Sequence, residues 1–104
     1  MSSVASSKMK RLIDANKVVV FSKSYCPFCV ATKNLFKSLD VVEIEVLELD
    51  RMGKEGEELQ VALFQETGQK SVPNVFVNGK HMGGNDDTQA AARNGTLQEM
   101  LKSA

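Results

Sequence analysis

The sequence predicts an α/β domain in which a four-stranded mixed sheet is flanked by helices on both faces. Helix-like and strand-like segments alternate along the chain, which is typical of parallel strands with a connecting helix. An Asn-Gly pair between two short strand-like runs predicts an antiparallel hairpin in the same sheet. The 104 residues are 42% apolar and 25% charged, as is usual for one globular domain with its own core. We therefore expect a single domain over residues 1–104.

The first half of the chain is expected to contain two helices and two parallel strands. A first helix over residues 4–16 makes up most of an N-terminal extension of about residues 1–17. Residues 18–21 form an unbroken β-branched and apolar run, which is typical of a strand covered on both faces. A second helix follows over residues 27–38, and a second strand over about residues 44–49. The side chains expected to face the core are Val4, Met9, Leu12 and Ile13 on the first helix, and Val30, Leu35, Phe36 and Leu39 on the second.

Glycines delimit a third helix. Gly53 and Gly56 predict a turn after the second strand. The helix is expected over about residues 57–65 and ends at Gly68, because glycine is the usual residue just past a helix C-terminus. Its buried residues are expected to be Leu59, Ala62 and Leu63.

A hairpin and two short helices are expected to complete the domain. Asn-Gly accepts positive φ at both corners of a tight turn, so Asn78-Gly79 predicts a hairpin with strands at residues 75–77 and 80–82. The remaining residues have helical character that Asn94-Gly95 interrupts. The second half of the chain thus adds an antiparallel pair to the parallel one.

Composition and charge exclude several function classes. The chain has 13 basic and 13 acidic residues, so no basic surplus is available to neutralise the phosphates of a nucleic acid. Its first 17 residues lack the apolar core of a signal peptide, and no membrane segment is expected. We expect a cytoplasmic monomer whose partners are a small molecule or another protein.

Both cysteines, Cys26 and Cys29, lie in the stretch KSYCPFC, and three roles are open to such a pair. A structural zinc site usually needs four Cys or His ligands, and the chain has two Cys and one His. A complete zinc site within one chain is therefore not expected, although two chains could share ligands around a cluster. A disulfide that closes so short a loop would add little stability, because its entropic effect grows with loop length. A reactive pair is the favoured interpretation.

The neighbours of Cys26 support this interpretation. Pro27 suits the first position of the second helix, where its missing N–H costs nothing. The unpaired N–H groups and the dipole at a helix N-terminus favour an anion, here the thiolate of Cys26, and Lys23 adds a positive charge nearby. Cys29 lies one turn later on the same face, within reach of a disulfide and in a more buried position. Cys26 is then the attacking thiol and Cys29 the resolving one.

A stabilised thiolate has its main advantage as a leaving group. Intrinsic nucleophilicity falls as basicity falls, so stabilisation changes the rate of attack little. The stabilised thiolate does leave faster when another thiol attacks its mixed disulfide. The cysteine pair therefore suits a carrier that accepts and releases small thiols.

Several motifs in the same order resemble those of the dithiol glutaredoxins, which have the thioredoxin fold. They are CPFC after VVVFSKSY, then SVPNVFVNGKHMGG, and then NDD, and the similarity runs over about residues 18–101. The resemblance implies an enzyme that reduces disulfides, above all protein–glutathione mixed disulfides. Glutathione would be its cosubstrate and electron source, and no permanently bound metal or organic cofactor is implied.

The resemblance also implies roles for the residues around the cysteines. Cys26 matches the nucleophile and Cys29 the resolving thiol of the family. Lys23 and Gln60 match residues that meet the carboxylate of the glycine end of glutathione. Tyr25, which directly precedes Cys26, is assigned to the same site.

Further site residues come from the later motifs. Val72 matches a residue whose backbone pairs with the cysteinyl part of glutathione, and Pro73 matches a cis proline. The other residues that the resemblance assigns to the glutathione site are Phe28, where the family often has Tyr, Ser71 in place of Thr, and Gly84, Asn85 and Asp86 at the γ-glutamyl end. Asp86 could also cap the helix that follows, a role compatible with ligand contact.

Two other functions stay open as alternatives. A general disulfide reductase of thioredoxin type would carry Trp before the first Cys and Gly-Pro between the pair, whereas this chain has no Trp and has Pro27-Phe28. A carrier of an iron–sulfur cluster in a glutathione-ligated dimer is the other alternative. Relatives of that kind mostly have Gly after the first Cys, and the stiffer Pro27 argues against it.

Overall fold

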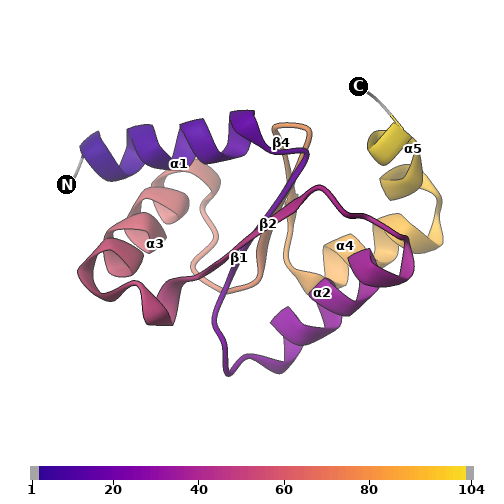
Figure 1. Ribbon diagram of the computed structural model, residues 1–104, viewed down its shortest axis with the longest axis horizontal. Coiled ribbons are helices and arrows are strands. Elements are labelled where there is room, and N and C mark those ends of the chain that lie inside the picture. Colours follow the sequence, from indigo (N-terminus) through magenta and orange to yellow (C-terminus); the bar gives the residue numbers. More distant parts are fainter. Residues whose placement is uncertain (1–2, 103–104) are drawn as a thin grey trace.

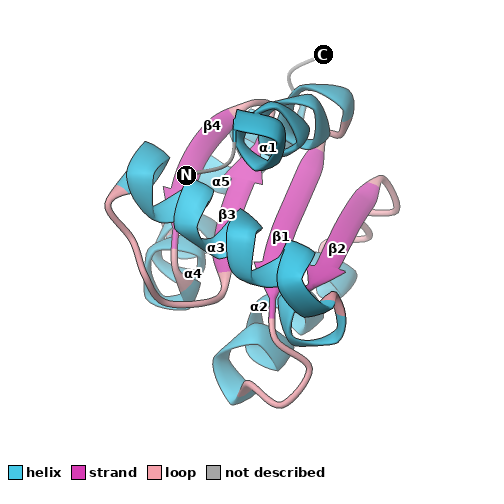
Figure 2. Ribbon diagram, turned by 90° about the vertical axis from the view of Figure 1, so that its left-hand side faces the viewer, coloured by secondary structure: helices cyan, strands magenta, loops and turns pink. Residues whose placement is uncertain are grey.

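The computed structural model describes residues 3–102 and has a central four-stranded sheet between two layers of helices (Figure 1). The strand order is β2-β1-β3-β4, with β1 parallel to β2 and antiparallel to β3, and β3 antiparallel to β4 (Figure 2). The elements in chain order are α1 (Ser3–Ala15), β1 (Val18–Ser22), α2 (Pro27–Ser38), β2 (Ile44–Glu48), the 3₁₀ turn η1 (Leu49–Arg51), α3 (Gly53–Thr67), β3 (Asn74–Val77), β4 (Lys80–Gly83), α4 (Asn85–Arg93) and α5 (Thr96–Lys102). The predicted mixed sheet with helices on both faces is confirmed. No helix in the described range is long and apolar enough to cross a membrane.

Strand β1 contributes to two separate cores, one on each face of the sheet. Val19 and Phe21 pack with α1 and α3, whereas Val18 and Val20 pack with α2, α4 and α5. All residues of β1 are buried. The prediction that residues 18–21 form a strand covered on both faces is therefore confirmed.

Helix α1 packs on α3, and three of the four core positions predicted on it are buried or partly buried. Ala5, Met9 and Ile13 are buried, and they are spaced four residues apart on one helical face. Val4 was expected in the core and is 74% exposed, because one residue corresponds to about 100° of rotation around the helix. Residues 1 and 2 of the predicted extension lie outside the described residues.

Helix α3 begins at Gly53, earlier than the predicted start at residue 57. Gly56 was taken as part of a turn, but it lies inside the helix and is buried. A Cβ atom at Gly56 would come within 2.0 Å of the carbonyl oxygen of Leu49. The glycine thus serves the close packing of α3 on η1, and sequence alone does not distinguish this role from a turn. The predicted burial of Leu59, Ala62 and Leu63 is confirmed.

The hairpin and the final helices agree with the prediction. Asn78 and Gly79 have φ of 49° and 81°, so both corners of the turn have positive φ. Strand β2 keeps a regular parallel register with β1, and the register shift of the sheet lies between Val75 and Phe76, where β3 pairs with β4. Helices α4 and α5 are separated at Asn94-Gly95, as expected.

Candidate active site

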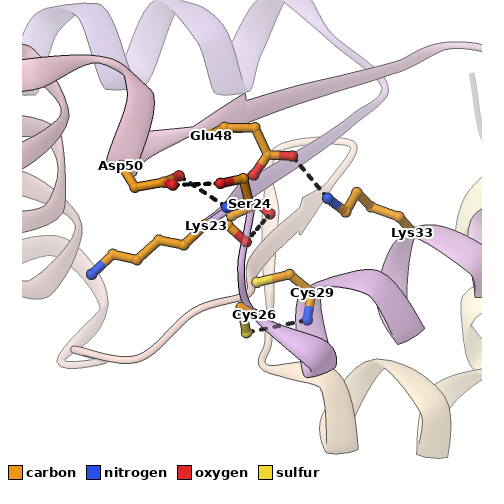
Figure 3. Close-up of polar contacts among 8 residues, drawn as sticks. Lys23, Ser24, Cys26, Cys29, Lys33, Glu48 and Asp50 are labelled. Atoms are coloured by element: carbon orange, nitrogen blue, oxygen red, sulfur yellow. Dashed lines mark hydrogen bonds and ion pairs between the residues drawn. The ribbon is translucent and has the colours of Figure 1, made fainter.

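The two cysteines lie where β1 leads into α2 (Figure 3). Cys26 is the N-cap residue of α2, in an extended conformation and partly exposed, and Pro27 is the first helical residue. The Sγ atom of Cys26 accepts a hydrogen bond from the backbone N–H of Cys29 at 3.3 Å. A sulfur in this position meets the free N–H groups of the first helical turn, which favours a negative charge there. The predicted location of Cys26 at the helix start is confirmed.

Cys29 differs from Cys26 in its burial. It is fully buried, and its thiol is free. Burial raises the pKa of the Cys29 thiol, and the neighbouring Cys26 raises it further, while a hydrogen bond with Ser22 lowers it in part. Cys29 is therefore held in its protonated form at neutral pH, behind the partly exposed Cys26.

Three of the four core positions predicted on helix α2 are buried or partly buried. Cys29, Thr32 and Phe36 are buried on it, whereas Val30 was expected in the core and is exposed. The ion pair between Lys33 Nζ and Glu48 Oε2, at 2.8 Å, joins the same helix to the end of β2.

A carboxylate from η1, the turn that follows β2, holds the loop before Cys26. Asp50 Oδ1 accepts a hydrogen bond from Ser24 N at 2.9 Å, and Asp50 Oδ2 accepts one from the Ser24 hydroxyl (Figure 3). The two bonds from Ser24 lower the pKa of the Asp50 carboxyl. The Lys23 side chain extends away from the two cysteines. The contact between Asp50 and Ser24 was not predicted from the sequence, because the partners are 26 residues apart and neither is unusual in its local context.

The segment before β3 passes directly beside Cys26. The Val72–Pro73 peptide bond is cis, as the resemblance implied. The Cys26 thiol contacts the carbonyl oxygen of Val72 at 3.7 Å. Gln69 Nε2 donates to the carbonyl oxygens of Ser71 and Pro73, both at 2.9 Å, and so holds the segment in shape. Gln69 was not predicted as a site residue, and its only signal in the sequence is its place just after the helix-ending Gly68.

An open groove of about 430 Å³ lies between this segment and the start of α4. It is lined by Phe28, Gln69, Ser71, Val72, Pro73, Gly84, Asn85, Asp86 and Asp87. Phe28 is 62% exposed beside it. The groove therefore collects most of the residues that were assigned to the glutathione site, together with Gln69 and Asp87, which were not.

A tight turn shapes the α4 wall of the groove. Gly84 is the N-cap of α4, and its N–H donates to Asp87 Oδ2 at 3.2 Å. The preceding Gly83 has φ of 107°, and a Cβ atom there would come within 2.3 Å of the same carboxylate oxygen. Capping by Asp86 was left open as an alternative role, and the structure shows Asp87 as the capping residue, because a side chain at the third helical position can reach back to the N-cap N–H. The exposed Asp86 carboxylate borders the groove instead.

Comparison with known proteins identifies the family. Residues 18–82 match the glutaredoxin family model. The chain is 50% identical over 101 residues to Glutaredoxin-C6 of Oryza sativa subsp. japonica, with 97% of this chain and 88% of the rice protein covered. The chain belongs to the glutaredoxin family.

Solved glutaredoxin structures have the same fold. Wheat glutaredoxin superposes with a TM-score of 0.92 at 49% identity, covering 98% of this chain and 94% of the wheat chain. A buckwheat glutaredoxin–glutathione complex superposes with a TM-score of 0.90 at 44% identity, covering 94% of this chain and 87% of the buckwheat chain. The fold is therefore the thioredoxin fold of glutaredoxins, and the protein is a glutathione-dependent oxidoreductase.

Three residues assigned to the glutathione site do not line the groove. Tyr25 is 71% exposed next to Cys26. Lys23 is partly exposed, and its ammonium group forms no ion pair within residues 3–102. Gln60 donates from Nε2 to the carbonyl oxygen of Lys70 at 3.0 Å, so its amide supports the segment that leads to Ser71.

Proposed function

We propose that this glutaredoxin reduces protein–glutathione mixed disulfides, with Cys26 as the attacking thiol and Cys29 as the resolving thiol. The observation that carries the proposal is the contrast between the two cysteines. Cys26 is accessible at the N-terminus of α2 and borders the Val72–Pro73 segment, whereas Cys29 is buried and its pKa is raised. Only Cys26 is available to a disulfide arriving from solvent.

In the first step the Cys26 thiolate attacks the glutathione sulfur of the mixed disulfide. A new sulfur–sulfur bond forms between Cys26 and glutathione, and the original disulfide breaks. The target thiolate leaves and takes a proton from water. Hydrogen bonding from Cys29 N and the dipole of α2 stabilise Cys26 both as an attacking thiolate and as a later leaving group.

Two routes regenerate the enzyme. In one, the thiolate of a second glutathione attacks the glutathione sulfur of the adduct. Glutathione disulfide is released, and Cys26 is left as a thiolate. In the other, Cys29 loses its proton and attacks Cys26 Sγ, so that glutathione leaves and an intramolecular disulfide forms. Two further glutathione molecules then reduce that disulfide. Glutathione supplies both electrons in either route.

We place glutathione in the groove between Val72–Pro73 and the start of α4. The cysteinyl part lies beside the backbone of Val72, which borders the reactive sulfur. The γ-glutamyl end lies at Gly84, Asn85 and Asp86, where the free N–H groups of the first turn of α4 attract its carboxylate and Asp86 attracts its ammonium group. The glycine carboxylate reaches toward Lys23 and Gln60.

Cysteine variants test the assignment of the two thiols. We expect Cys26→Ser to abolish reduction of a small glutathione mixed disulfide, because no other accessible thiol can form the adduct. We expect Cys29→Ser to retain a substantial part of the activity, because a second glutathione can release the adduct directly. Turnover measured with purified wild type and both variants decides the point. An active Cys26→Ser variant, or equal loss in both variants, would contradict the proposal.

We further propose that the protein works as a monomer in the cytoplasm. The balanced formal charge of the chain supports a small-molecule or protein partner. Light scattering of the reduced protein with glutathione tests the monomer, and fractionation of the source cells tests the compartment.

A further inference from the structure

A buried hydroxyl links the helix of the cysteines to the turn at the start of α4. Thr32 is fully buried, and it lies one helical turn after Cys29 on the buried side of α2. Its Oγ1 donates a hydrogen bond to Asn85 Oδ1 at 2.8 Å. The partners are 53 residues apart in the chain, so this contact exists only in the folded protein.

Asn85 receives a second bond on the same oxygen. Gln89 Nε2 donates to Asn85 Oδ1 at 3.2 Å and to the carbonyl oxygen of Ala31 at 3.4 Å. Thr32, Asn85 and Gln89 thus form a small polar network between α2 and α4, two helices that pack on each other. Polar groups that are at least partly buried, as these are, define one relative position of two elements better than apolar contacts alone.

The network connects the two functional parts of the proposed site. Asn85 and its neighbours Gly84 and Asp86 line the groove where the γ-glutamyl end is proposed to bind. Helix α2 carries Cys26 at its N-cap. The distance between the bound γ-glutamyl group and the reacting sulfur is therefore determined by how α4 sits on α2, and small errors in such a distance are costly to reaction rates.

We propose that Thr32 is a positioning residue that holds the γ-glutamyl-binding turn in register with the cysteines through Asn85. The γ-glutamyl group then serves to orient the disulfide for attack by Cys26. This inference rests on the proposed function, and it gives the side chain of Asn85, a residue that lines the groove, a role within the protein.

The test compares two small disulfides that differ only in the γ-glutamyl group. They are the mixed disulfides of 2-mercaptoethanol with glutathione and with cysteinylglycine. The rate constant for transfer of each peptide onto Cys26 is measured in single turnovers by mass spectrometry, in a Cys29→Ser background so that the adduct persists. The ratio of the rate constant for the glutathione disulfide to that for the cysteinylglycine disulfide measures how much the γ-glutamyl group accelerates the transfer.

We expect Thr32→Val to lower the rate constant for the glutathione disulfide roughly two- to tenfold, which corresponds to loss of one hydrogen bond. The rate constant for the cysteinylglycine disulfide stays unchanged, so the ratio falls. Thr32→Ser keeps the hydroxyl and should keep the ratio. In combination with Asn85→Ala, Thr32→Val should lower the ratio no further, because both changes break the same bond. Gln89 still pairs with Asn85 in Thr32→Val, so the variant is expected to fold.

Other outcomes overturn the inference in distinguishable ways. Equal loss with both disulfides, or equal loss in Thr32→Ser and Thr32→Val, would show a packing role for Thr32. A wild-type preference for glutathione that Thr32→Val keeps would refute the inference and leave the proposed function intact. If wild type shows no preference, or if Asp86→Asn leaves its preference unchanged, the proposed placement of glutathione fails, and the inference fails with it.

Discussion

Asp50 restrains the loop that leads into Cys26 through hydrogen bonds with Ser24. Its two oxygens accept the N–H and the hydroxyl of Ser24, two residues before Cys26. A carboxylate can accept both bonds at once, whereas an amide offers a single acceptor oxygen. The loop geometry therefore depends on the ionised form of Asp50.

We expect Asp50→Asn to lower the melting temperature at neutral pH. The pKa of Asp50 is lowered in the folded protein, so the stability that this carboxylate contributes is fully present above its ordinary unfolded pKa of about 4. That stability is lost as the pH falls through the lowered folded pKa. The difference in melting temperature between wild type and variant should thus shrink with acidification, which thermal melts followed by circular dichroism over a pH series will measure.

Glu45→Gln is a suitable control for Asp50→Asn, because Glu45 is exposed on β2. It should leave the melting temperature nearly unchanged at every pH. A difference for Asp50→Asn that stays constant or grows on acidification would show that the Ser24 contact does not depend on the charge.

Among the contacts between elements, the packing of α3 on η1 requires a residue without a Cβ atom at Gly56. Gly56 lies within the helix, directly against the backbone of Leu49. The turn η1 contains both Leu49 and Asp50. The same three-residue turn therefore packs against α3 and holds the loop before Cys26. The physical constraint at Gly56 is a close approach of two backbones.

We expect Gly56→Ala to destabilise the protein by about 1–3 kcal/mol, because the new Cβ would overlap the Leu49 carbonyl and force a backbone shift. Helix propensity alone favours Ala over Gly by about 1 kcal/mol, so the sign of the effect is informative. Urea denaturation measures it, and Glu57→Ala at the next, exposed position serves as control. A stabilised Gly56→Ala variant would contradict the close approach.

For the whole molecule, β1 joins two cores into one cooperative unit. Alternate residues of this strand supply buried side chains to the core under α1 and α3 and to the core under α2, α4 and α5. Loss of packing in one core destabilises β1, and the other core contains side chains of the same strand. The two cores are therefore expected to unfold together.

We expect Met9→Ala and Phe36→Ala, one in each core, to shift one common unfolding transition. The expected losses are about 2–5 kcal/mol for Met9→Ala and about 3–5 kcal/mol for Phe36→Ala, because both side chains are almost completely buried. Urea titrations followed by circular dichroism and by hydrogen exchange of amides on both faces measure this. Val42→Ala, at a position that is 87% exposed, should change little. Separate transitions for the two faces would refute a single cooperative unit.

The amino-acid sequence was sufficient to predict the features that depend on neighbouring residues. Residues 18–21 are apolar and β-branched throughout, Asn78-Gly79 suits a tight hairpin turn, and Pro27 suits the start of a helix. The position of Cys26 at that helix start followed from the same local rules. Most of the residues that line the groove were assigned through the resemblance of short motifs to those of the dithiol glutaredoxins.

Only the tertiary structure decided which distant residues meet. The contacts of Asp50 with Ser24 and of Thr32 with Asn85 join segments far apart in the chain, and no local pattern marks them. Val4 and Gly56 were misread for a related reason: periodicity gives a helical face only to within a residue, and a glycine can serve a turn or a close approach. Local propensity acts over a few residues, whereas polar pairing and close packing depend on how whole elements are placed against each other.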